Sequence, residues 1–447
     1  MSEEIQKIIR EIQSLFKGYE IYLVGGTVRD LLLNRKISDL DFCTNAHPQE
    51  IKTLLNKFSS SVYNIGEKFG TIGCLKDNLE IQITTYRSDL YDSISRKPKV
   101  AFESELLKDL SRRDFKINSL AWDGKTFIDP YQGLKDLKDK VITFTGNPEE
   151  RIKEDPLRML RAIRLASQLD FSLPKETFSA ILKNSQELRR VSAERVATEI
   201  DKILLSAQPA QGIRLFYRTN LYQGFLPLDL MEIEQPQNYH HKNVLEHTLL
   251  LLEKCPPNLI TRWAGLLHDL GKAETRTLVE GEVHFYGHEE VSARLGRKVL
   301  RKLRYSNDFI NKVSLLVRSH MYVHGYGREG VVWSDGAVRR LIRKMGELFP
   351  NFLNLIKADI TSSRPEVVEA CLRRVKELEE RIEKIKKEEE VEKIKCLLDG
   401  NEIMEIIGIS PSKLVGEVKD FVFQRQLDRG KSYTKEQAIE DVRDRFG

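Results

Sequence analysis

Residues 21–33 read IYLVGGTVRDLLL, and residues 38–42 read SDLDF. The first stretch predicts a short strand that ends in a Gly-Gly turn and is followed by a helix. The second stretch predicts another strand, in which Asp39 and Asp41 lie on one face, about 6–7 Å apart, because strand side chains alternate. Two carboxylates on one face are suited to hard divalent cations, which prefer oxygen ligands. A site with two metal ions about 3.5–4 Å apart can hold the attacking and leaving oxygens of an in-line phosphoryl displacement.

The turn between the first strand and its helix contains Gly25 and Gly26, whose lack of side chains lets backbone N–H groups approach a triphosphate. Arg29 follows within reach of the same phosphates. Taken alone, Gly-Gly predicts only a turn, and Asp-x-Asp predicts only a solvated strand end. In this order and spacing, G-G-x-V-R-D-x-L-L followed by D-x-D resembles the first motif of the class II tRNA nucleotidyltransferases. That family shares with bacterial poly(A) polymerases the nucleotidyltransferase palm of the DNA polymerase beta superfamily, and the resemblance implies that Asp39 and Asp41 hold catalytic Mg²⁺.

The composition indicates a soluble protein of several domains: 447 residues exceed one ordinary core, 31% are charged, and the mean hydropathy is −0.40. We expect no membrane association, because no apolar run approaches the roughly 18 residues of a membrane span. Residues 1–16 predict an amphipathic helix, not a signal sequence. The five cysteines are scattered and odd in number, which predicts neither disulfides nor a Cys-x-x-Cys metal site and favours a reducing cytoplasm. The net charge of +5 permits an acidic partner such as RNA without requiring one.

The order of the expected elements divides the chain into four parts. Residues 1–139 mix short strands and helices, which predicts an α+β head. Residues 140–237 are helical in pattern and form a neck, and residues 238–365 form a body that contains a second group of metal-binding residue types. Residues 366–447 begin with a helix of mixed charge, which predicts a solvated spacer. The glycine-punctuated end of this part resembles the tail that grips the tRNA elbow in longer family members.

The head is expected to contain strands at 21–24, 40–42, 71–75, 79–84 and 125–128, with a hairpin turn at Asp77-Asn78. Residues 86–100 read YRSDLYDSISRKPKV and predict a long polar loop. This loop resembles the flexible loop between the family's first two motifs, although Ser95-Arg96-Lys97-Pro98 departs from the more usual paired arginines. The resemblance implies addition of the terminal A, because CC-only enzymes typically lack the loop. A third carboxylate ligand is compatible with a neighbouring strand, but no residue is assigned to it.

Residues 112–118 read RRDFKIN, which could be a surface helix with a few charges. As an intact Arg-Arg-Asp-x-x-x-Asn block, it resembles the family's ribose-reading motif. The resemblance implies that Asp114 accepts a hydrogen bond from the ribose hydroxyl, which distinguishes ribonucleotides from deoxyribonucleotides. Arg113 would contact phosphate or ribose, and Asn118 would order the motif.

Residues 154–164 read EDPLRMLRAIR, and the spacing predicts that Asp155 and Arg158 are neighbours on one helix face. One interpretation is an ion pair between them, with Arg161 and Arg164 in solvent. The stretch also resembles the family's nucleotide-selecting motif, Glu-Asp-x-x-Arg, which implies that Asp155 and Arg158 act as a protein template and that Arg161 and Arg164 belong to the nucleotide-binding residues. A carboxylate accepts from an exocyclic amino group while a guanidinium donates to a ring nitrogen or carbonyl oxygen. Such a pair could select CTP and ATP and reject UTP and GTP.

A helix is also expected over residues 192–204, SAERVATEIDKIL, with Ser192 as its cap and with Arg195 and Glu199 spaced i, i+4. This stretch resembles the last motif that the family shares. We expect it to support the template helix.

The body contains a pattern of histidines and aspartates on expected helices: His247, His268, Asp269, His288, His320 and Asp359. A single histidine on an apolar helix is usually a core residue, but imidazoles and carboxylates gathered from several helices make an open divalent site. The pattern resembles an HD-type phosphohydrolase domain. The resemblance implies His247, His268, Asp269 and Asp359 as ligands of a divalent transition metal, with His288 and His320 available for a second metal. An inactive remnant of such a site is the alternative.

We therefore expect a multidomain α+β enzyme: a nucleotidyltransferase head with a DNA polymerase beta-type palm and a mixed sheet, followed by an all-helical neck, an HD-type body and a tail. The expected function is template-independent, Mg²⁺-dependent addition of CCA to the 3′ end of tRNA from CTP and ATP. Three alternatives remain: an A-adding enzyme that works with a separate CC-adding enzyme, a bacterial poly(A) polymerase, and an HD phosphohydrolase with an RNA-binding head. The expected partners are tRNA and the two nucleotides, and the pattern does not predict an oligomeric state.

Overall fold

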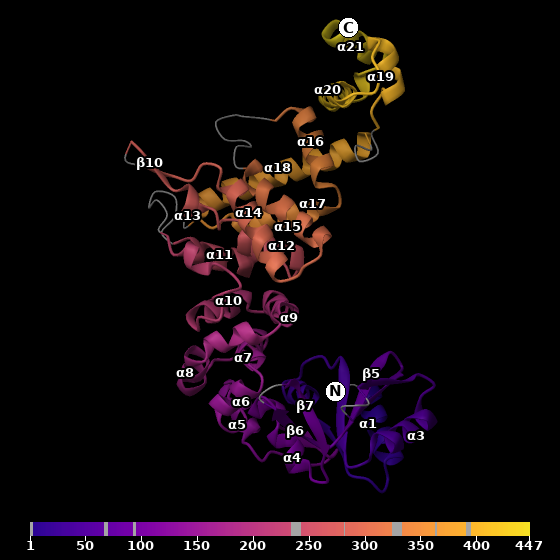
Figure 1. Cartoon of the computed structure of the whole chain (residues 1–447), viewed down its shortest axis with the longest axis vertical. Coiled ribbons are helices and arrows are strands. Elements are labelled where there is room, and N and C mark those ends of the chain that lie inside the picture. Colours follow the sequence, from indigo (N-terminus) through magenta and orange to yellow (C-terminus); the bar gives the residue numbers. More distant parts are fainter. Residues whose placement is uncertain are drawn as a thin grey trace. The chain divides into compact units, whose positions relative to one another are not determined.

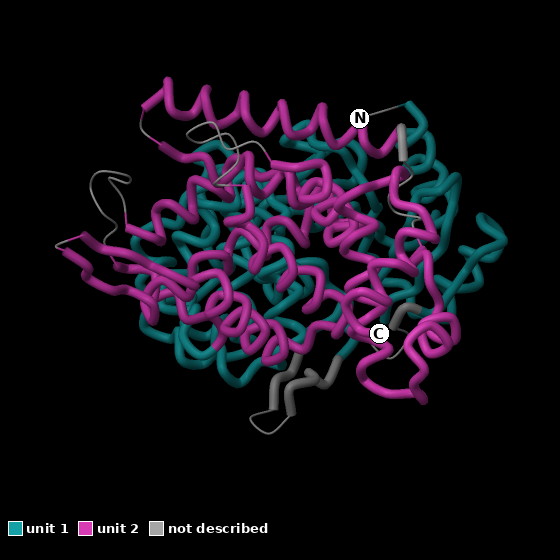
Figure 2. The backbone as a smooth tube through the Cα atoms, turned by 90° about the horizontal axis from the view of Figure 1, so that it is seen from above, with its two compact units in different colours: residues 1–224 teal, residues 225–447 magenta. Residues whose placement is uncertain are grey.

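A computed structural model describes residues 3–66, 70–92, 95–233, 243–280, 282–323, 333–362, 364–389 and 395–447. The chain forms two compact units, residues 1–224 and residues 225–447 (Figure 2). The finer division into head, neck, body and tail stays a prediction. No helix in these described ranges is long and apolar enough to cross a lipid bilayer.

The head is built on a seven-stranded sheet with the order β3-β4-β5-β2-β1-β8-β9. Its strands are β1 (Ile21–Val24), β2 (Asp39–Thr44), β3 (Val62–Gly66), β4 (Thr71–Lys76), β5 (Leu79–Thr85), β8 (Ala121–Trp122) and β9 (Phe127–Ile128). Within this sheet β2 pairs in parallel with β5, and the other neighbours pair antiparallel, so the predicted mixed sheet is confirmed. The predicted strands at 21–24, 40–42, 71–75 and 79–84 are confirmed, whereas the one at 125–128 is shorter than predicted, and β3 and β8 were not predicted.

A separate two-stranded sheet replaces the loop predicted over residues 86–100. It consists of β6 (Arg87–Asp92) and β7 (Ser95–Phe102), which pair antiparallel. The prediction of a loop is wrong because it rested on polar composition, whereas such a ribbon is held by main-chain hydrogen bonds that almost any side chain permits. The predicted turn at Asp77-Asn78 is confirmed, and both residues have positive φ, +50° and +62°, as a tight hairpin turn requires.

Helices complete the head: α1 (Glu3–Leu15), α2 (Gly26–Leu32), α3 (Pro48–Phe58), α4 (Leu106–Ser111) and α5 (Gly133–Asp139), with a 3-10 turn at Lys116–Asn118 (Figure 1). The amphipathic pattern of α1 buries Ile8, Ile9 and Ile12, as expected for a helix with one apolar face. Alternation along β2 buries Leu40 and Phe42. The neighbouring aspartates of β2 are therefore left on the opposite face, where the site forms.

Residues 140–237, which were predicted as a helical neck, are mainly helical where they are described. It contains α6 (Pro148–Glu154), α7 (Leu157–Leu169), α8 (Lys175–Lys183), α9 (Ala193–Leu204) and α10 (Pro209–Arg218), with a 3-10 turn at Ser185–Arg190. The apolar side of α7 packs against α9 and α10, which buries Met159, Leu160 and Ile163. Burial of this stripe holds α7 in place, so that its polar side faces the head.

The second unit is mainly helical (Figure 1). Its helices are α11 (Val244–Lys254), α12 (Leu259–Leu267), α13 (Lys272–Thr275), α14 (His288–Lys302), α15 (Asn307–Ser319), α16 (Asp335–Met345), α17 (Phe349–Asp359), α18 (Pro365–Glu389), α19 (Gly400–Ile407), α20 (Lys413–Arg429) and α21 (Lys435–Phe446), with 3-10 turns at Leu228–Met231, His320–Val323, Gly346–Leu348 and Gly430–Ser432. A short hairpin, β10 (Thr277–Val279) and β11 (Glu282–His284), precedes α14. Asn243 and Asn258 cap α11 and α12, since each side chain accepts a hydrogen bond from a first-turn N–H. The predicted fold class, an α+β head followed by helical parts, is confirmed.

Candidate active site and metal cluster

The acidic pair of β2 stands beside the start of α2. Thr27, in the first turn of α2, joins the helix to the strand. Its Oγ1 donates to the carbonyl oxygen of Asp39 at 3.3 Å and accepts from the backbone N–H of Asp41 at 3.1 Å. Asp39 Oδ1 accepts a further hydrogen bond from Ser38 Oγ at 2.7 Å. The structure thus brings both carboxylates next to the Gly-Gly turn.

The electrostatics of Asp41 indicate a site for a cation. Its pKa is raised to about 6, because burial disfavours its charge and the neighbouring Asp39 repels it, while Arg113 acts in the opposite direction and Glu80 adds to the repulsion. A divalent cation bound by the two carboxylates would remove this repulsion, and carboxylate oxygens are the ligands that Mg²⁺ prefers. The donor set therefore fits a divalent metal ion.

Glu80 is a third carboxylate at this site that the sequence did not assign. The parallel pairing of β2 with β5 places it directly opposite Asp39. Its Oε1 accepts from Tyr63 Oη at 3.1 Å and from Gln82 Nε2 at 3.2 Å. Glu80 reaches the site through the register of β5 against β2, two strands that are far apart in sequence. A single sequence does not display this register.

Two arginines pack onto the Gly-Gly turn. Gly25 has φ +69°, and a Cβ at this position would lie 2.8 Å from Arg113 Nη1, so glycine is required there. A Cβ at Gly26 would lie 3.4 Å from Arg29 Nη2. Arg29 Nη1 also donates to Asn118 Oδ1 at 2.8 Å. The four residues that were predicted to touch phosphate, and Asn118 with them, therefore gather around one turn.

Asp114 is held on both sides. Its Oδ1 accepts from the backbone N–H of Phe115 at 2.9 Å and from Asn118 Nδ2 at 3.0 Å. Its Oδ2 lies 2.5 Å from Arg161 Nη2. Burial works against its charge, but Arg161 and Asn118 stabilise that charge, so the pKa of Asp114 is lowered. Asp114 is thus an ionised acceptor at neutral pH.

Asp155 does not lie on a helix, which corrects the prediction that it shares a helix face with Arg158. It lies between α6 and α7 in an extended conformation, φ −147° and ψ 101°, because Pro156 begins a new helix. Its Oδ1 accepts from the backbone N–H of Leu157 at 3.2 Å, and its Oδ2 accepts from Arg195 Nη2 at 2.7 Å. The carboxylate is therefore oriented by α7 and by α9, and Arg195 pairs with Asp155 instead of with Glu199 along its own helix.

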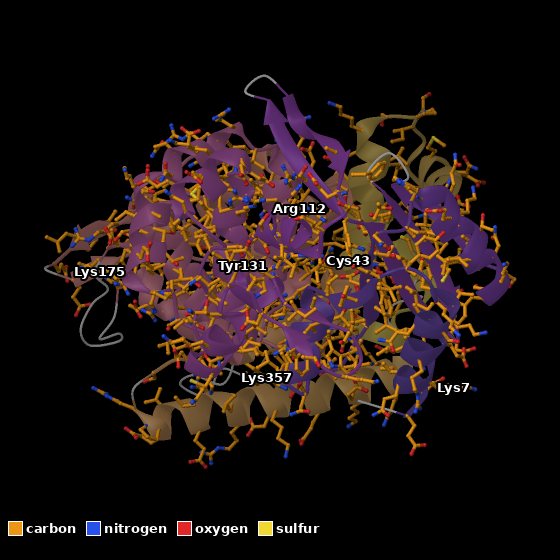
Figure 3. All side chains as sticks on the ribbon, turned by 90° about the horizontal axis from the view of Figure 1, so that it is seen from below. Lys7, Cys43, Arg112, Tyr131, Lys175 and Lys357 are labelled. Atoms are coloured by element: carbon orange, nitrogen blue, oxygen red, sulfur yellow. The ribbon has the colours of Figure 1, made fainter. Side chains whose placement is uncertain are left out.

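Arg158 is buried and has its own partners. Its guanidinium forms an ion pair with Glu154. Its Nη1 donates to the carbonyl oxygen of Arg151 at 3.1 Å, and its Nη2 donates to the carbonyl oxygen of Arg112 at 3.1 Å (Arg112 is labelled in Figure 3). The interpretation in which Arg158 pairs with Asp155 is therefore wrong.

The two arginines further along α7 are not solvated, which also corrects that interpretation. Arg161 pairs with Asp114 of the head, and Arg164 Nη1 lies 3.1 Å from the carboxylate of Glu199. Both pairs are at least half removed from solvent. Arg161 therefore joins α7 to the motif that is predicted to contact the ribose, whereas Arg164 binds α7 to α9.

The second unit gathers all six side chains predicted for its metal site. In His268, His288 and His320, ring atom Nδ1 lies 2.7–2.8 Å from the carbonyl oxygen three residues earlier, and His247 Nδ1 lies 2.8 Å from Thr361 Oγ1. Such contacts fix the ring orientation and leave Nε2 for a metal. All four rings present Nε2 to one centre.

One half of this centre combines His247, His268 and Asp359, whose ligand atoms all lie within 4.8 Å of one another. His247 Nε2 is 3.2 Å from His268 Nε2 and 3.0 Å from Asp359 Oδ1. Burial works against the charge of His268, but Asp269 and Asp359 raise its pKa to about 10. The two carboxylates thus favour positive charge at this position, as a bound metal ion would supply.

The other half is organised by Asp269. Its Oδ2 is 3.1 Å from His268 Nε2, and its Oδ1 is 3.3 Å from His288 Nε2 and 4.0 Å from His320 Nε2. Burial and the charge of His268 lower the pKa of His320 to about 3, so this imidazole is neutral, as a metal ligand must be. Lys272, which was not predicted, places Nζ 2.8 Å from Asp269 Oδ2. The two oxygens of Asp269 therefore face two sets of imidazoles.

Three family models match the chain in the order of these sites. A poly A polymerase head domain matches residues 21–143, a probable RNA and SrmB-binding site of polymerase A matches residues 170–228, and an HD domain matches residues 239–396. A CCA-adding enzyme of Ligilactobacillus salivarius (strain UCC118) is 43% identical over 229 residues, which are 51% of this chain and 55% of that protein. Separate parts of the chain are thus similar to domains of poly(A) polymerases and to CCA-adding enzymes.

Other CCA-adding enzymes are similar over a comparable length. A CCA-adding enzyme of Geobacillus sp. (strain WCH70) is 39% identical over 231 residues, which are 51% of this chain and 56% of that protein. The match thus spans about half the length of these curated relatives. Divalent metal dependence is general among nucleotidyltransferases, in agreement with the acidic pair of β2.

Solved structures of CCA-adding enzymes have the same fold over almost their whole length. The crystal structure of the Bacillus stearothermophilus CCA-adding enzyme in complex with CTP has a TM-score of 0.71 at 25% identity and covers 100% of this chain and 98% of its own. The Thermotoga maritima CCA-adding enzyme complexed with tRNA has a TM-score of 0.57 at 20% identity, with 99% and 95% covered. The second likeness concerns the fold alone.

Proposed function

We propose that this protein adds C, C and A to the 3′ end of tRNA, using CTP and ATP and no nucleic-acid template. One observation carries the proposal. The acidic pair Asp39 and Asp41, in which the pKa of Asp41 is raised, lies beside a glycine turn that two arginines contact. Asp155 and Arg158 lie in the same compact unit. The related CCA-adding enzymes support the same reaction, and the CTP and tRNA in the titles of solved relatives support the substrates.

The acidic pair would hold the metal. We expect Asp39 and Asp41 to bind Mg²⁺, with Glu80 close enough to influence the affinity. Bound there, Mg²⁺ would favour ionisation of the tRNA 3′-hydroxyl and neutralise charge on the triphosphate. The protein's own contribution is to place the two carboxylates on the same face of β2.

The glycine turn would hold the nucleotide's phosphates. The backbone N–H of Gly26 lies in the first turn of α2, where the helix dipole favours an anion, whereas the N–H of Gly25 donates to the carbonyl oxygen of Leu120 at 3.3 Å. Arg29 and Arg113 add two cations at the same turn. Asp114, ionised and fixed by Asn118, would accept a hydrogen bond from the ribose hydroxyl.

Asp155 and Arg158 would read the base. Cytosine and adenine both present an exocyclic amino group beside a ring acceptor, which a carboxylate and a guanidinium can recognise together. Each carboxylate oxygen has two acceptor positions, so the bonds of Asp155 to Leu157 and Arg195 leave capacity for an amino group. The bonds of Arg158 to two backbone carbonyls and its ion pair with Glu154 fix the position of its guanidinium.

The test supplies purified protein with tRNA that lacks CCA, with tRNA that ends in CC, and with each nucleotide singly. The proposal predicts C addition to the first substrate, A addition to the second, and rejection of UTP and GTP. Addition of A alone would identify an enzyme that depends on a separate CC-adding enzyme. Processive A tails on unrelated RNA would identify a poly(A) polymerase. Ready incorporation of UTP or GTP would refute the assignment of Asp155 and Arg158.

A second activity, metal-dependent phosphate-ester hydrolysis, is favoured by the histidine cluster of the second unit. In each ring a contact at Nδ1 fixes the orientation, so that the Nε2 atoms of the four rings face one centre and can bind a transition metal. We expect Asp39→Ala with Asp41→Ala to abolish nucleotide addition and leave this hydrolysis intact. His268→Ala should do the reverse, and loss of both activities in either variant would contradict two separate sites.

We propose that the reaction takes place in the cytoplasm, which agrees with the five free cysteines.

The tail helices α19–α21 have their own apolar core, and we propose that they contact tRNA.

A further inference from the structure

Asp109 is a buried carboxylate that the proposed reaction does not use. It lies in the last turn of α4 with 0% of its side chain exposed. Its Oδ1 accepts from Arg112 Nε at 3.0 Å and Nη2 at 2.6 Å, and its Oδ2 accepts from Arg113 Nε at 3.3 Å and Nη2 at 2.9 Å. Burial opposes its charge, but Arg113 and Arg112 stabilise the charge and lower the pKa of Asp109. One ionised carboxylate therefore holds two guanidinium groups, one with each oxygen.

The two arginines do not behave as ordinary surface partners on a helix. Helix α4 ends at Ser111, and the chain after it turns towards the nucleotide site. A solvated i, i+4 pair contributes little and would not need complete burial. A buried pair is costly unless it is fully bonded, which makes its geometry strongly determined.

The first arm of this arrangement reaches the phosphate-binding turn. With Nε and Nη2 on Asp109, Arg113 turns Nη1 towards Gly25, where a Cβ would lie only 2.8 Å away. The position of Arg113 therefore matters to the packing of the glycine turn.

The second arm reaches the base-reading residues. Arg112 binds Asp109 through its side chain, and its backbone carbonyl oxygen accepts from Arg158 Nη2 at 3.1 Å. One residue earlier, the carbonyl oxygen of Ser111 accepts from Arg151 Nη1 at 3.3 Å. The backbone that leaves α4 thus supports the guanidinium that would read the base.

We propose that Asp109 is a positioning residue of the nucleotide site: one carboxylate oxygen holds Arg113 against the glycine turn, and the other holds the Arg112 backbone on which Arg158 rests. The inference deepens the proposed function and depends on it. Asp109 touches neither nucleotide nor metal. It sets the distance between the groups that would bind phosphate and the group that would select the base.

The test uses the full chain with three single variants. Asp109→Asn keeps the size of the side chain and removes its charge, and Asp109→Glu keeps the charge. Glu103→Gln is the matched control, since Glu103 precedes α4 and binds Lys108 and Ser88 and neither Arg112 nor Arg113. We would measure thermal unfolding, and kcat and KM for CTP, ATP and UTP on tRNA lacking its end.

In Asp109→Asn we expect kcat/KM for CTP and for ATP to fall by about tenfold or more, and the preference for CTP over UTP to fall by a similar factor. Asp109→Glu should recover part of that preference, and Glu103→Gln should stay within about twofold of the parent. A folded Asp109→Asn that keeps the parental preference would overturn the inference even if its overall rate were lower. A merely structural carboxylate would change the amount of folded protein and leave the preference unaltered.

If Asp109→Asn does not fold, the double variant Asp109→Asn with Arg112→Gln removes one of the two guanidinium charges that Asp109 binds, and the backbone carbonyl at position 112 remains. Lost preference in this variant supports the inference, and parental preference overturns it. A wild-type protein that adds no nucleotide would refute the proposed function instead, so the two failures are distinguishable.

Discussion

Replacement of Asp155 by Asn tests the base-reading proposal most directly. Asn keeps the size of the side chain and an oxygen that can accept from the Leu157 N–H, so the start of α7 should be preserved. The lost ion pair to Arg195 is exposed, with 24% of the Asp155 side chain and 48% of the Arg195 side chain in solvent. Such pairs contribute about 0–1 kcal/mol, so we expect the free energy of unfolding to change by no more than about 1 kcal/mol.

The effect on selection should be larger than the effect on stability. A hydrogen bond to a charged acceptor contributes about 1.5–3 kcal/mol, and each 1.36 kcal/mol corresponds to about tenfold in rate. We therefore expect the preference for CTP over UTP, measured as the ratio of their kcat/KM values, to fall by about 10- to 150-fold. The amide group of Asn can also donate to the uracil carbonyl, which acts in the same direction.

Single-nucleotide incorporation on tRNA lacking its end measures this ratio. Glu187→Gln is the control, because Glu187 forms an exposed ion pair of similar length with Arg190 in the same neck. A folded Asp155→Asn protein with the parental CTP-to-UTP ratio would refute the reasoning. An equal change in Glu187→Gln would show that the loss of any neck ion pair suffices.

Three further predictions concern the metal sites and the neck. Asp41 must be ionised to bind a cation, and its pKa is raised to about 6. Mg²⁺ affinity measured by calorimetry should therefore weaken about tenfold per pH unit as the pH falls below 6 and should be constant well above it. A flat profile from pH 5 to 7 would contradict the role of Asp41. Glu199→Gln leaves the largely buried Arg164 without its carboxylate and should lower the free energy of unfolding, measured by chemical denaturation, by about 3–5 kcal/mol. The double variant Glu199→Leu with Arg164→Met should lower it by less, because no buried charge remains. Equal losses in the two variants would argue against the pair. His320→Ala should lower the affinity of the second unit for a transition metal by about 10- to 100-fold, measured by metal content after dialysis, and should leave nucleotide addition unchanged. An unaltered metal content would exclude His320 as a ligand.

The local chemistry of the head could be predicted from the chain itself because it depends on short-range rules. Alternation along residues 39–42 determines that both aspartates share a face, and the glycine pair determines where the chain can turn tightly. The positive φ of Gly25 and the burial of Leu40 and Phe42 follow from these rules. The spacing of histidines and aspartates likewise predicted a cluster, and all six side chains meet.

Other features depend on contacts between segments that are distant in sequence. Asp155 and Arg158 are three residues apart, yet a helix break separates them, and their partners come from α9 and from the end of α4. The ribbon of β6 and β7 forms through backbone pairing that polar composition does not reveal. Glu80 enters the site only through the register of β5 against β2.

The sequence by itself therefore determined which chemical groups this protein has and the order in which they occur, because strand alternation and turn geometry act within a few residues. Only the tertiary structure decided which of those groups touch. Asp109 shows the difference most clearly: with Arg112 and Arg113, three and four residues later, it looks like part of a solvated helix end. Its burial instead makes these three residues a support that reaches both Gly25 and Arg158. The physical reason is that a carboxylate removed from water must be fully bonded, and the fold alone provides its partners.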